Sequence, residues 1–291
     1  MKLNTFNKRR MLSEGCTAAI RVLAYGIAAD AVDEYLRLGE TTTRSCVEHF
    51  VEGIIYLFGD EYLRRPTSAD LQRLLDIGER QGFLGMIGSI DCMHWEWKNC
   101  PTAWKCQYSR GSGKPTIVLE AVASYDQWIW HAFFGPPCTL NYINVLDRSP
   151  VFDEIINGQA PQVTFFVNGS EYHLAYYLTD GIYPKWATFI QSIPIPQGPK
   201  ARLFAQHQEA VRKDVERAFG VLQARFAIVK NPALFWDKVK IRKIMRAYIP
   251  TNIVNMMGVR TRIRDRQMHQ QLKADLVEYI CRKFGRQEDN Y

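Results

Sequence analysis

FLGMIGSIDCMHWEWK, residues 83–98, is the stretch that decides the fold of this 291-residue chain. Its short runs of apolar, β-branched and aromatic residues are typical of a buried strand. Two similar segments follow, TIVLEAVASYD at 116–126 and WIWHAFFG at 128–135, and the short polar link between them indicates a hairpin. We therefore expect three strands in succession at the start of a sheet.

The chain downstream of these strands alternates between strand and helix patterns. Residues 140–158 favour a crossover helix that breaks at Pro150, and the Asn168-Gly169 pair inside 162–180 predicts another hairpin. After a Pro-rich loop at 192–200, residues 205–229 form the longest predicted helix, whose apolar face carries Val211, Val215, Phe219 and Leu222. This order predicts an α/β fold with a mixed sheet flanked by helices.

The N-terminal part of the chain has a helical pattern instead. Helices are predicted over 16–39, 41–59 and 68–82, with glycines near their ends and Ser68 or Asp70 near the cap of the third. Two helices meeting at a Gly-containing turn resemble a helix-turn-helix, and an ordinary helical bundle is the alternative. We therefore divide the chain into a helical segment at 1–82, a catalytic domain at 83–258 and a basic helical tail at 259–291.

Composition excludes several classes of protein. Hydrophobic residues make up 47% and charged residues 23% of the chain, which is ordinary for a globular protein. No apolar run approaches the roughly 20 residues that span a bilayer, and the polar start lacks the apolar core of a secretory signal. Seven cysteines without a framework spacing predict reduced thiols inside a cell.

The charge of the chain is distributed unevenly. Of the formal charge of +7, residues from Lys200 onward contribute 20 basic and 9 acidic side chains, whereas residues 1–199 contribute 17 and 21. A basic C-terminal third suits a polyanion such as nucleic acid, and a solvated, charged helical surface explains the same pattern. Charge alone does not choose between them.

Three carboxylates occupy places where this layout concentrates chemistry. Asp91 ends the first strand, Asp180 ends a later strand in YYLTDGIYP, and Glu216 lies in the long helix in RKDVERAFG. Charged groups at strand ends face a cleft at the edge of a sheet rather than its core. Each has an ordinary alternative: a strand-end cap for Asp91, a turn for Asp180, and a helix ion pair for Glu216.

Gathering three carboxylates requires a cation. At about 4 Å and an effective dielectric near 20, each like-charged pair repels by roughly 4 kcal/mol. Oxygen ligands select Mg²⁺ or Mn²⁺, and two such ions about 4 Å apart suit in-line attack on phosphorus. In this interpretation Asp91 bridges both ions, while Asp180 and Glu216 each hold one.

Other residues give weaker indications of a site. Arg110 and Lys114 in a glycine loop, and Arg212, Lys213 and Arg217 beside Glu216, are candidate phosphate contacts; a solvent-exposed turn and helix-surface ion pairs are the alternatives. His94 is a candidate for tuning the metal site, whereas the spacing of Cys92, His94, Cys100 and Cys106 matches no common zinc site. Trp95, Trp97 and Trp104 are expected in the core, with base stacking as the alternative.

Longer segments resemble a known family. GSIDCMHWEWKNCP (88–101), YYLTDGIYPKWATF (176–189) and FAQHQEAVRKDVERAFGVLQARF (204–226), together with LEAVAS, WIWHAFFG and DLVEYI, resemble the transposase of PIF/Harbinger elements, especially the plant branch. The resemblance implies an RNase H-like catalytic domain whose DDE triad falls on Asp91, Asp180 and Glu216. It also implies DNA cleavage at element terminal repeats, action in the nucleus and a Myb-like partner protein, and it leaves a homo-oligomer open.

The chain also departs from the family pattern. Tyr142 stands where the family usually has Asp, and IPTNIVNMM (249–257) replaces a Leu-His-Asn stretch and places Pro250 inside a predicted helix, where proline costs about 3 kcal/mol or more. The short N-terminus raises the expectation that an upstream segment is missing. The alternative to an active transposase is therefore a decayed or domesticated copy that binds DNA or protein without catalysis.

Overall fold

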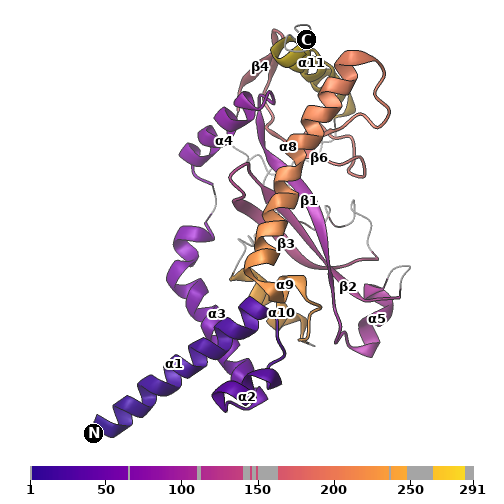
Figure 1. The fold of residues 1–291 in the computed structure, drawn as a ribbon. Coiled ribbons are helices and arrows are strands. Elements are labelled where there is room, and N and C mark those ends of the chain that lie inside the picture. Colours follow the sequence, from indigo (N-terminus) through magenta and orange to yellow (C-terminus); the bar gives the residue numbers. More distant parts are fainter. Residues whose placement is uncertain are drawn as a thin grey trace, which may run out of the picture.

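The structure is a computed structural model, shown as a ribbon in Figure 1. It describes residues 2–64, 66–109, 113–139, 145, 149, 163–235, 237–247 and 265–285. The predicted crossover helix at 140–158 lies almost wholly outside the described residues, as do Arg110, Tyr142 and residues 249–257. These expectations therefore stay predictions.

A five-stranded mixed sheet forms the centre of the fold, in the order β3-β2-β1-β6-β7. β1 pairs antiparallel with β2, which pairs antiparallel with β3, whereas β1, β6 and β7 run parallel. The strands span Met86–Glu96 (β1), Thr116–Ala123 (β2), Ile129–Pro137 (β3), Tyr176–Thr179 (β6) and Phe189–Gln191 (β7). This mixed sheet, flanked by helices, is consistent with an RNase H-like fold and confirms the predicted fold class.

The three strands expected from residues 83–135 are all present, and the hairpin of β2 and β3 is confirmed. The second predicted hairpin is confirmed too: β4 (Phe165–Val167) and β5 (Ser170–Tyr172) pair antiparallel in a small separate sheet. Asn168 and Gly169 have φ angles of 53° and 89°, the conformation that a tight hairpin turn requires at both central positions. The sequence does not indicate β7, because three residues are too few to show a periodicity.

The N-terminal segment is helical, as expected, but its boundaries differ from the prediction. The helices are α1 (Lys2–Tyr25), η1 (Asp30–Val32), α2 (Asp33–Leu36), α3 (Glu40–Tyr62) and α4 (Ser68–Arg80). The single helix expected over 16–39 is wrong. Gly26 ends α1 with a φ of +60°, and a Cβ there would lie 2.7 Å from the carbonyl oxygen of Ala227.

The ends of the next two helices also shift. The helix preceding Gly39 is the single turn α2, so the predicted pair of long helices meeting at Gly39 is wrong. α3 continues through Gly59 to Tyr62. α4 is capped by Thr67 rather than by Ser68 or Asp70, because the Thr67 side chain and Asp70 form a reciprocal capping box.

The long predicted helix is confirmed as α8 (Gly198–Arg225), which runs along the sheet and over β1 (Figure 1). The four residues of its expected apolar face are all buried against the sheet and its neighbouring helices: Val211, Val215, Phe219 and Leu222. The remaining helices are α5 (Thr102–Tyr108), α9 (Ala227–Lys230), α10 (Lys238–Arg246) and α11 (Arg266–Phe284). α11 confirms the amphipathic helix expected in the tail.

The tryptophans divide between core and surface. Trp95 and Trp97 are buried, and their indole nitrogens donate to the backbone oxygens of Asn231 and Phe235. Trp104 packs against Trp97 but is 41% exposed, so its expected place in the core is wrong. It lies on the short helix α5, which is too short to bury every aromatic ring that it carries.

Candidate active site

Asp91 and Asp180 lie on neighbouring parallel strands. Ser89 on β1 is paired with Leu178 on β6, and each aspartate stands two residues further along its strand direction. Residues two apart on a strand share a face, and neighbouring strands are about 4.8 Å apart. The sheet register therefore places Asp180, which directly follows β6, next to the middle of β1. The expectation that Asp91 ends its strand is wrong, because β1 stays paired with β2 beyond Asp91 as far as Glu96.

α8 covers the face of the sheet on which these carboxylates lie. Ser89 donates to the backbone oxygen of Val211 on this helix at 3.4 Å, so the face of β1 that carries Ser89 and Asp91 is turned toward α8. The buried side chain of Gln208 donates to the carbonyl oxygens of Thr179 and Ile190 at 2.9 and 3.1 Å. These contacts fix α8 against β6 and β7 beside Asp180.

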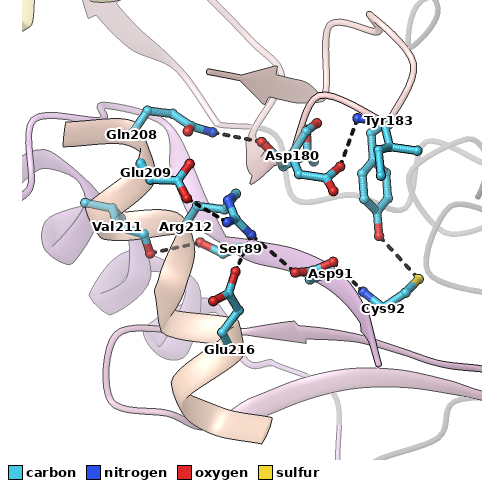
Figure 2. Close-up of polar contacts among 12 residues, drawn as sticks. Ser89, Asp91, Cys92, Asp180, Tyr183, Gln208, Glu209, Val211, Arg212 and Glu216 are labelled. Carbon is cyan, nitrogen blue, oxygen red and sulfur yellow. Dashed lines mark hydrogen bonds and ion pairs between the residues drawn. The ribbon is translucent and has the colours of Figure 1, made fainter. Parts of the chain in front are cut away.

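The centre of the site is the guanidinium of Arg212 (Figure 2). Its Nη1 lies 2.7 Å from Oε1 of Glu216 and 3.2 Å from Oδ2 of Asp91, and its Nη2 lies 3.0 Å from Oε1 of Glu209. The Arg212 side chain is only 9% exposed, whereas that of Glu216 is 45% exposed. One arginine thus connects the strand carboxylate with two carboxylates of α8.

Burial and charge change the acidity of this group. Burial, together with the charges of Asp180 and Glu216, raises the pKa of Asp91 to about 6, although the Cys92 amide and the charge of Arg212 act to lower it. Burial lowers the pKa of Arg212, but the hydrogen bond to Glu209 and the charges of Glu216 and Asp91 outweigh it, so its pKa lies above the ordinary value. The guanidinium is therefore charged at every physiological pH.

The turn after β6 holds the Asp180 side chain. Oδ1 of Asp180 accepts from the amide of Ile182 at 3.0 Å. The buried Tyr183 that follows places its hydroxyl 3.4 Å from Sγ of Cys92, and its carbonyl oxygen accepts from Gln191. The turn predicted at Asp180 is thus present, and it joins the ends of β6 and β7 to the middle of β1.

Two of the weaker candidates do not lie in the carboxylate cluster. His94 is exposed and stands three residues beyond Asp91 on β1, so the strand alternation directs it to the opposite face. Lys114 is exposed and pairs with Glu96 at 3.2 Å. The sequence signal for His94 was its proximity to Asp91 in the chain, which the pleat of the strand separates, whereas the signal for Lys114 was its glycine-containing loop.

The three basic residues near Glu216 differ from one another. Arg212 is buried among carboxylates, Arg217 is half-exposed and pairs with Asp214, and Lys213 is exposed. The helix-surface ion pair that was the alternative for this group is present at Arg217. Lys213 is exposed, and its contact with a phosphate stays a prediction.

Sequence reasoning missed Glu209, Gln208 and the place of Arg212 inside the cluster. The signal was available: Glu209, Arg212 and Glu216 are spaced by three and four positions, and such residues are neighbours on one face of a helix. Only the contact between α8 and the sheet shows that this face meets Asp91.

The carboxylate oxygens of this cluster are the kind of ligand that a hard divalent cation prefers, but in the structure they surround the guanidinium of Arg212. Among the described residues, no three carboxylate, imidazole or thiolate side chains lie at a spacing that would hold a metal ion. Asp91 and Glu216 instead share the positive charge of Arg212. Oxygen donors of this kind fit Mg²⁺ or Mn²⁺.

The helices of the described part include none with the length and apolar composition needed to cross a membrane. A family model described as plant transposon protein matches residues 60–262 of the chain, which include β1, β6 and α8. No curated protein and no solved structure matches.

Proposed function

The chain belongs to the plant transposon protein family, and we propose that it is a DDE transposase or nuclease of the PIF/Harbinger type that cuts DNA phosphodiester bonds. In this proposal Asp91, Asp180 and Glu216 are the ligands of two Mg²⁺ or Mn²⁺ ions. The substrate is the terminal DNA of the element, the site of action is the nucleus, and a Myb-like protein assists.

One observation carries the proposal. Asp91 and Asp180 stand at equivalent positions of adjacent parallel strands, and Glu216 reaches Asp91 through a single shared nitrogen of Arg212. Asp91 and Asp180 are 89 positions apart in the chain, and Asp180 and Glu216 are 36 apart, so this arrangement supports a common site that local sequence does not create. Such a concentration of negative charge is unfavourable unless cations neutralise it.

The proposed reaction is a substitution at phosphorus. An oxygen of water, or of a 3′-hydroxyl in strand transfer, bonds to phosphorus while the bond to the leaving 3′ oxygen breaks. The nucleophile loses a proton and the leaving oxygen gains one. Bound Mg²⁺ or Mn²⁺ would lower the pKa of the attacking water and neutralise the charge that develops on the leaving oxygen.

In this proposal the side chains hold the metal ligands in place and form no covalent bond to the DNA. Asp91 and Asp180 are fixed by the sheet register, and Glu216 is fixed by the packing of α8, which Gln208 and Ser89 fasten to the strands. Preorganised groups of this kind need no rearrangement as charge develops in the transition state. The exposed Lys213 next to this cluster is suited to hold a backbone phosphate.

A second candidate is a relic that binds DNA or protein without catalysis. The observation that favours it is the guanidinium of Arg212, which already neutralises part of the carboxylate charge. A site that keeps this arginine in place permanently would have no use for a metal.

The two candidates are separated by incubating pure protein with supercoiled plasmid DNA and Mn²⁺. We expect nicked DNA from the wild type, no nicking with EDTA, and none from Asp91→Asn or Asp180→Asn. Glu171→Gln, an exposed carboxylate on β5, is the control and should nick like the wild type. Nicking that persists in both aspartate variants would exclude this site, and its absence from the wild type, with terminal-repeat DNA as well, would favour the relic.

A further inference from the structure

The buried arginine of the carboxylate cluster has an unusual set of partners. Arg212 makes ion pairs with Glu209, Glu216 and Asp91, and the four carboxylates of the region, including Asp180, exceed its single positive charge. Figure 2 shows the guanidinium lying between the α8 carboxylates and β1. The guanidinium is the positive charge in contact with Asp91, and it offsets the repulsion from Asp180 and Glu216.

A single nitrogen serves both of the outer members of the proposed triad. Nη1 of Arg212 lies 2.7 Å from Glu216 and 3.2 Å from Asp91. A Mg²⁺ ion held by the same two oxygens needs contacts of about 2.0–2.1 Å to each. The ion and Nη1 would therefore compete for the same oxygens, and their charges would repel each other.

The remaining contacts of Arg212 leave it displaceable. Its Nε is buried and has no hydrogen-bond partner in the part of the chain that the structure describes, so the carboxylates alone hold the guanidinium. Nη2 pairs with Glu209, three residues earlier on α8 and 45% exposed. Glu209 therefore offers a partner at the outer edge of the site after the pairs with Asp91 and Glu216 are broken.

We infer that Arg212 is an internal counterion of the site, which holds Asp91 and Glu216 together until a divalent metal displaces its guanidinium toward Glu209. This inference rests on the proposed function, since it requires a metal to bind at these carboxylates. Arg212 is then a positioning residue. It keeps like charges close together without metal and sets the metal concentration at which the site is loaded.

Removing Arg212 should change the affinity for metal in one direction if the arginine competes with the metal, and in the opposite direction if it only supports the fold. If Arg212 only supported the fold, Arg212→Gln would weaken metal binding by disordering the carboxylates. If its charge competes with the metal, Arg212→Gln should bind metal more tightly and lose stability without it. Arg212→Lys keeps the charge and should restore an affinity close to that of the wild type.

The test is a titration of the full chain with Mn²⁺, with free Mn²⁺ measured by electron paramagnetic resonance. We expect Arg212→Gln to bind about tenfold more tightly than the wild type, from the loss of one competing charge. Arg217→Gln, which changes an arginine of the same helix that pairs with Asp214, should leave the affinity unchanged. An affinity for Arg212→Gln equal to or below that of the wild type would overturn the inference.

A second measurement uses the wild type, so that a folding defect of the variant does not decide the result. With ¹⁵N-arginine labelling, one Nε–H resonance should move during a Mg²⁺ titration and saturate together with metal binding. Saturation without any arginine resonance responding would also overturn the inference. Metal binding that is absent from the wild type, or equal in Asp91→Ala, would instead refute the proposed function, and the inference with it.

Discussion

Nη1 of Arg212 lies 3.2 Å from Oδ2 of Asp91, although 121 positions separate the two residues along the chain. The contact joins α8 to the middle of the central strand β1, next to the carboxyl end of β6. It also identifies which face of α8 belongs to the site, since Glu209 and Glu216 share that face with Arg212. The predictions for Asp91, Glu216 and Gln208 depend on this junction between α8 and the sheet.

Divalent metal should stabilise the folded protein through Asp91. A ligand that binds only the folded state at 100 times its Kd adds about 2.7 kcal/mol to the free energy of unfolding. We therefore expect Mg²⁺ or Mn²⁺ to raise the Tm by several degrees in a thermal scan. The rise should vanish in Asp91→Ala, and an equal rise in that variant would contradict the assignment of Asp91 as a ligand.

Glu216→Gln should separate cleavage from DNA binding. The substitution keeps the size of the side chain and removes the charge that a metal requires, so we expect DNA cleavage to fall to background. The side chain is one carboxylate among several, so the Kd for DNA should change by less than about tenfold, or about 1.4 kcal/mol. Fluorescence anisotropy gives the Kd, and a loss of affinity that matches the loss of cleavage would refute the prediction.

Gln208 should contribute to stability through its two hydrogen bonds to the strands. Gln208→Met keeps the volume but leaves the buried carbonyl oxygens of Thr179 and Ile190 without this donor. We expect the free energy of unfolding to fall by about 2–6 kcal/mol, at about 1–3 kcal/mol for each of the two buried groups left unpaired. Urea unfolding measures the loss, and Gln206→Met at an exposed position of α8 is the control.

Glu120 should make stability depend on pH. It is completely buried on β2 and accepts a hydrogen bond from Ser149, and burial raises the pKa of its carboxyl from 4.5 to about 7. A folded pKa above the unfolded one contributes stability that is fully present below about pH 4.5 and is lost as the pH rises through about 7. The neighbouring His131 stays neutral in this range, because burial lowers its pKa to about 3.

Glu120→Gln tests this dependence, because glutamine cannot ionise. Relative to the wild type, the variant should gain stability between about pH 5 and about pH 8, by up to about 3 kcal/mol at 1.4 kcal/mol for each pH unit separating the two pKa values. Urea unfolding at both pH values measures this, with Glu171→Gln on the exposed hairpin as the control. A difference between variant and wild type that does not change with pH would exclude Glu120 as the titrating group.

The sequence by itself determined the elements with a clear periodicity, and it singled out the three acids of the proposed site. The runs at 83–98, 116–126 and 128–135 became β1, β2 and β3, and the apolar stripe of α8 is buried as its spacing predicts. Patterns with a period of two or 3.6 residues are local, so they can be read without knowing the partner of each element. The end of α1 at Gly26 was not predictable in this way, because its cause is the close approach of Ala227.

Only the tertiary structure decided what surrounds those acids. The pairing of Ser89 with Leu178 sets Asp91 beside Asp180, and the packing of α8 sets Arg212 between Asp91 and Glu216. The pleat of β1 sends His94 to the other face. Such relations depend on the register between strands and on the rotation of a helix over a sheet, and neither is encoded in the spacing of residues within one segment.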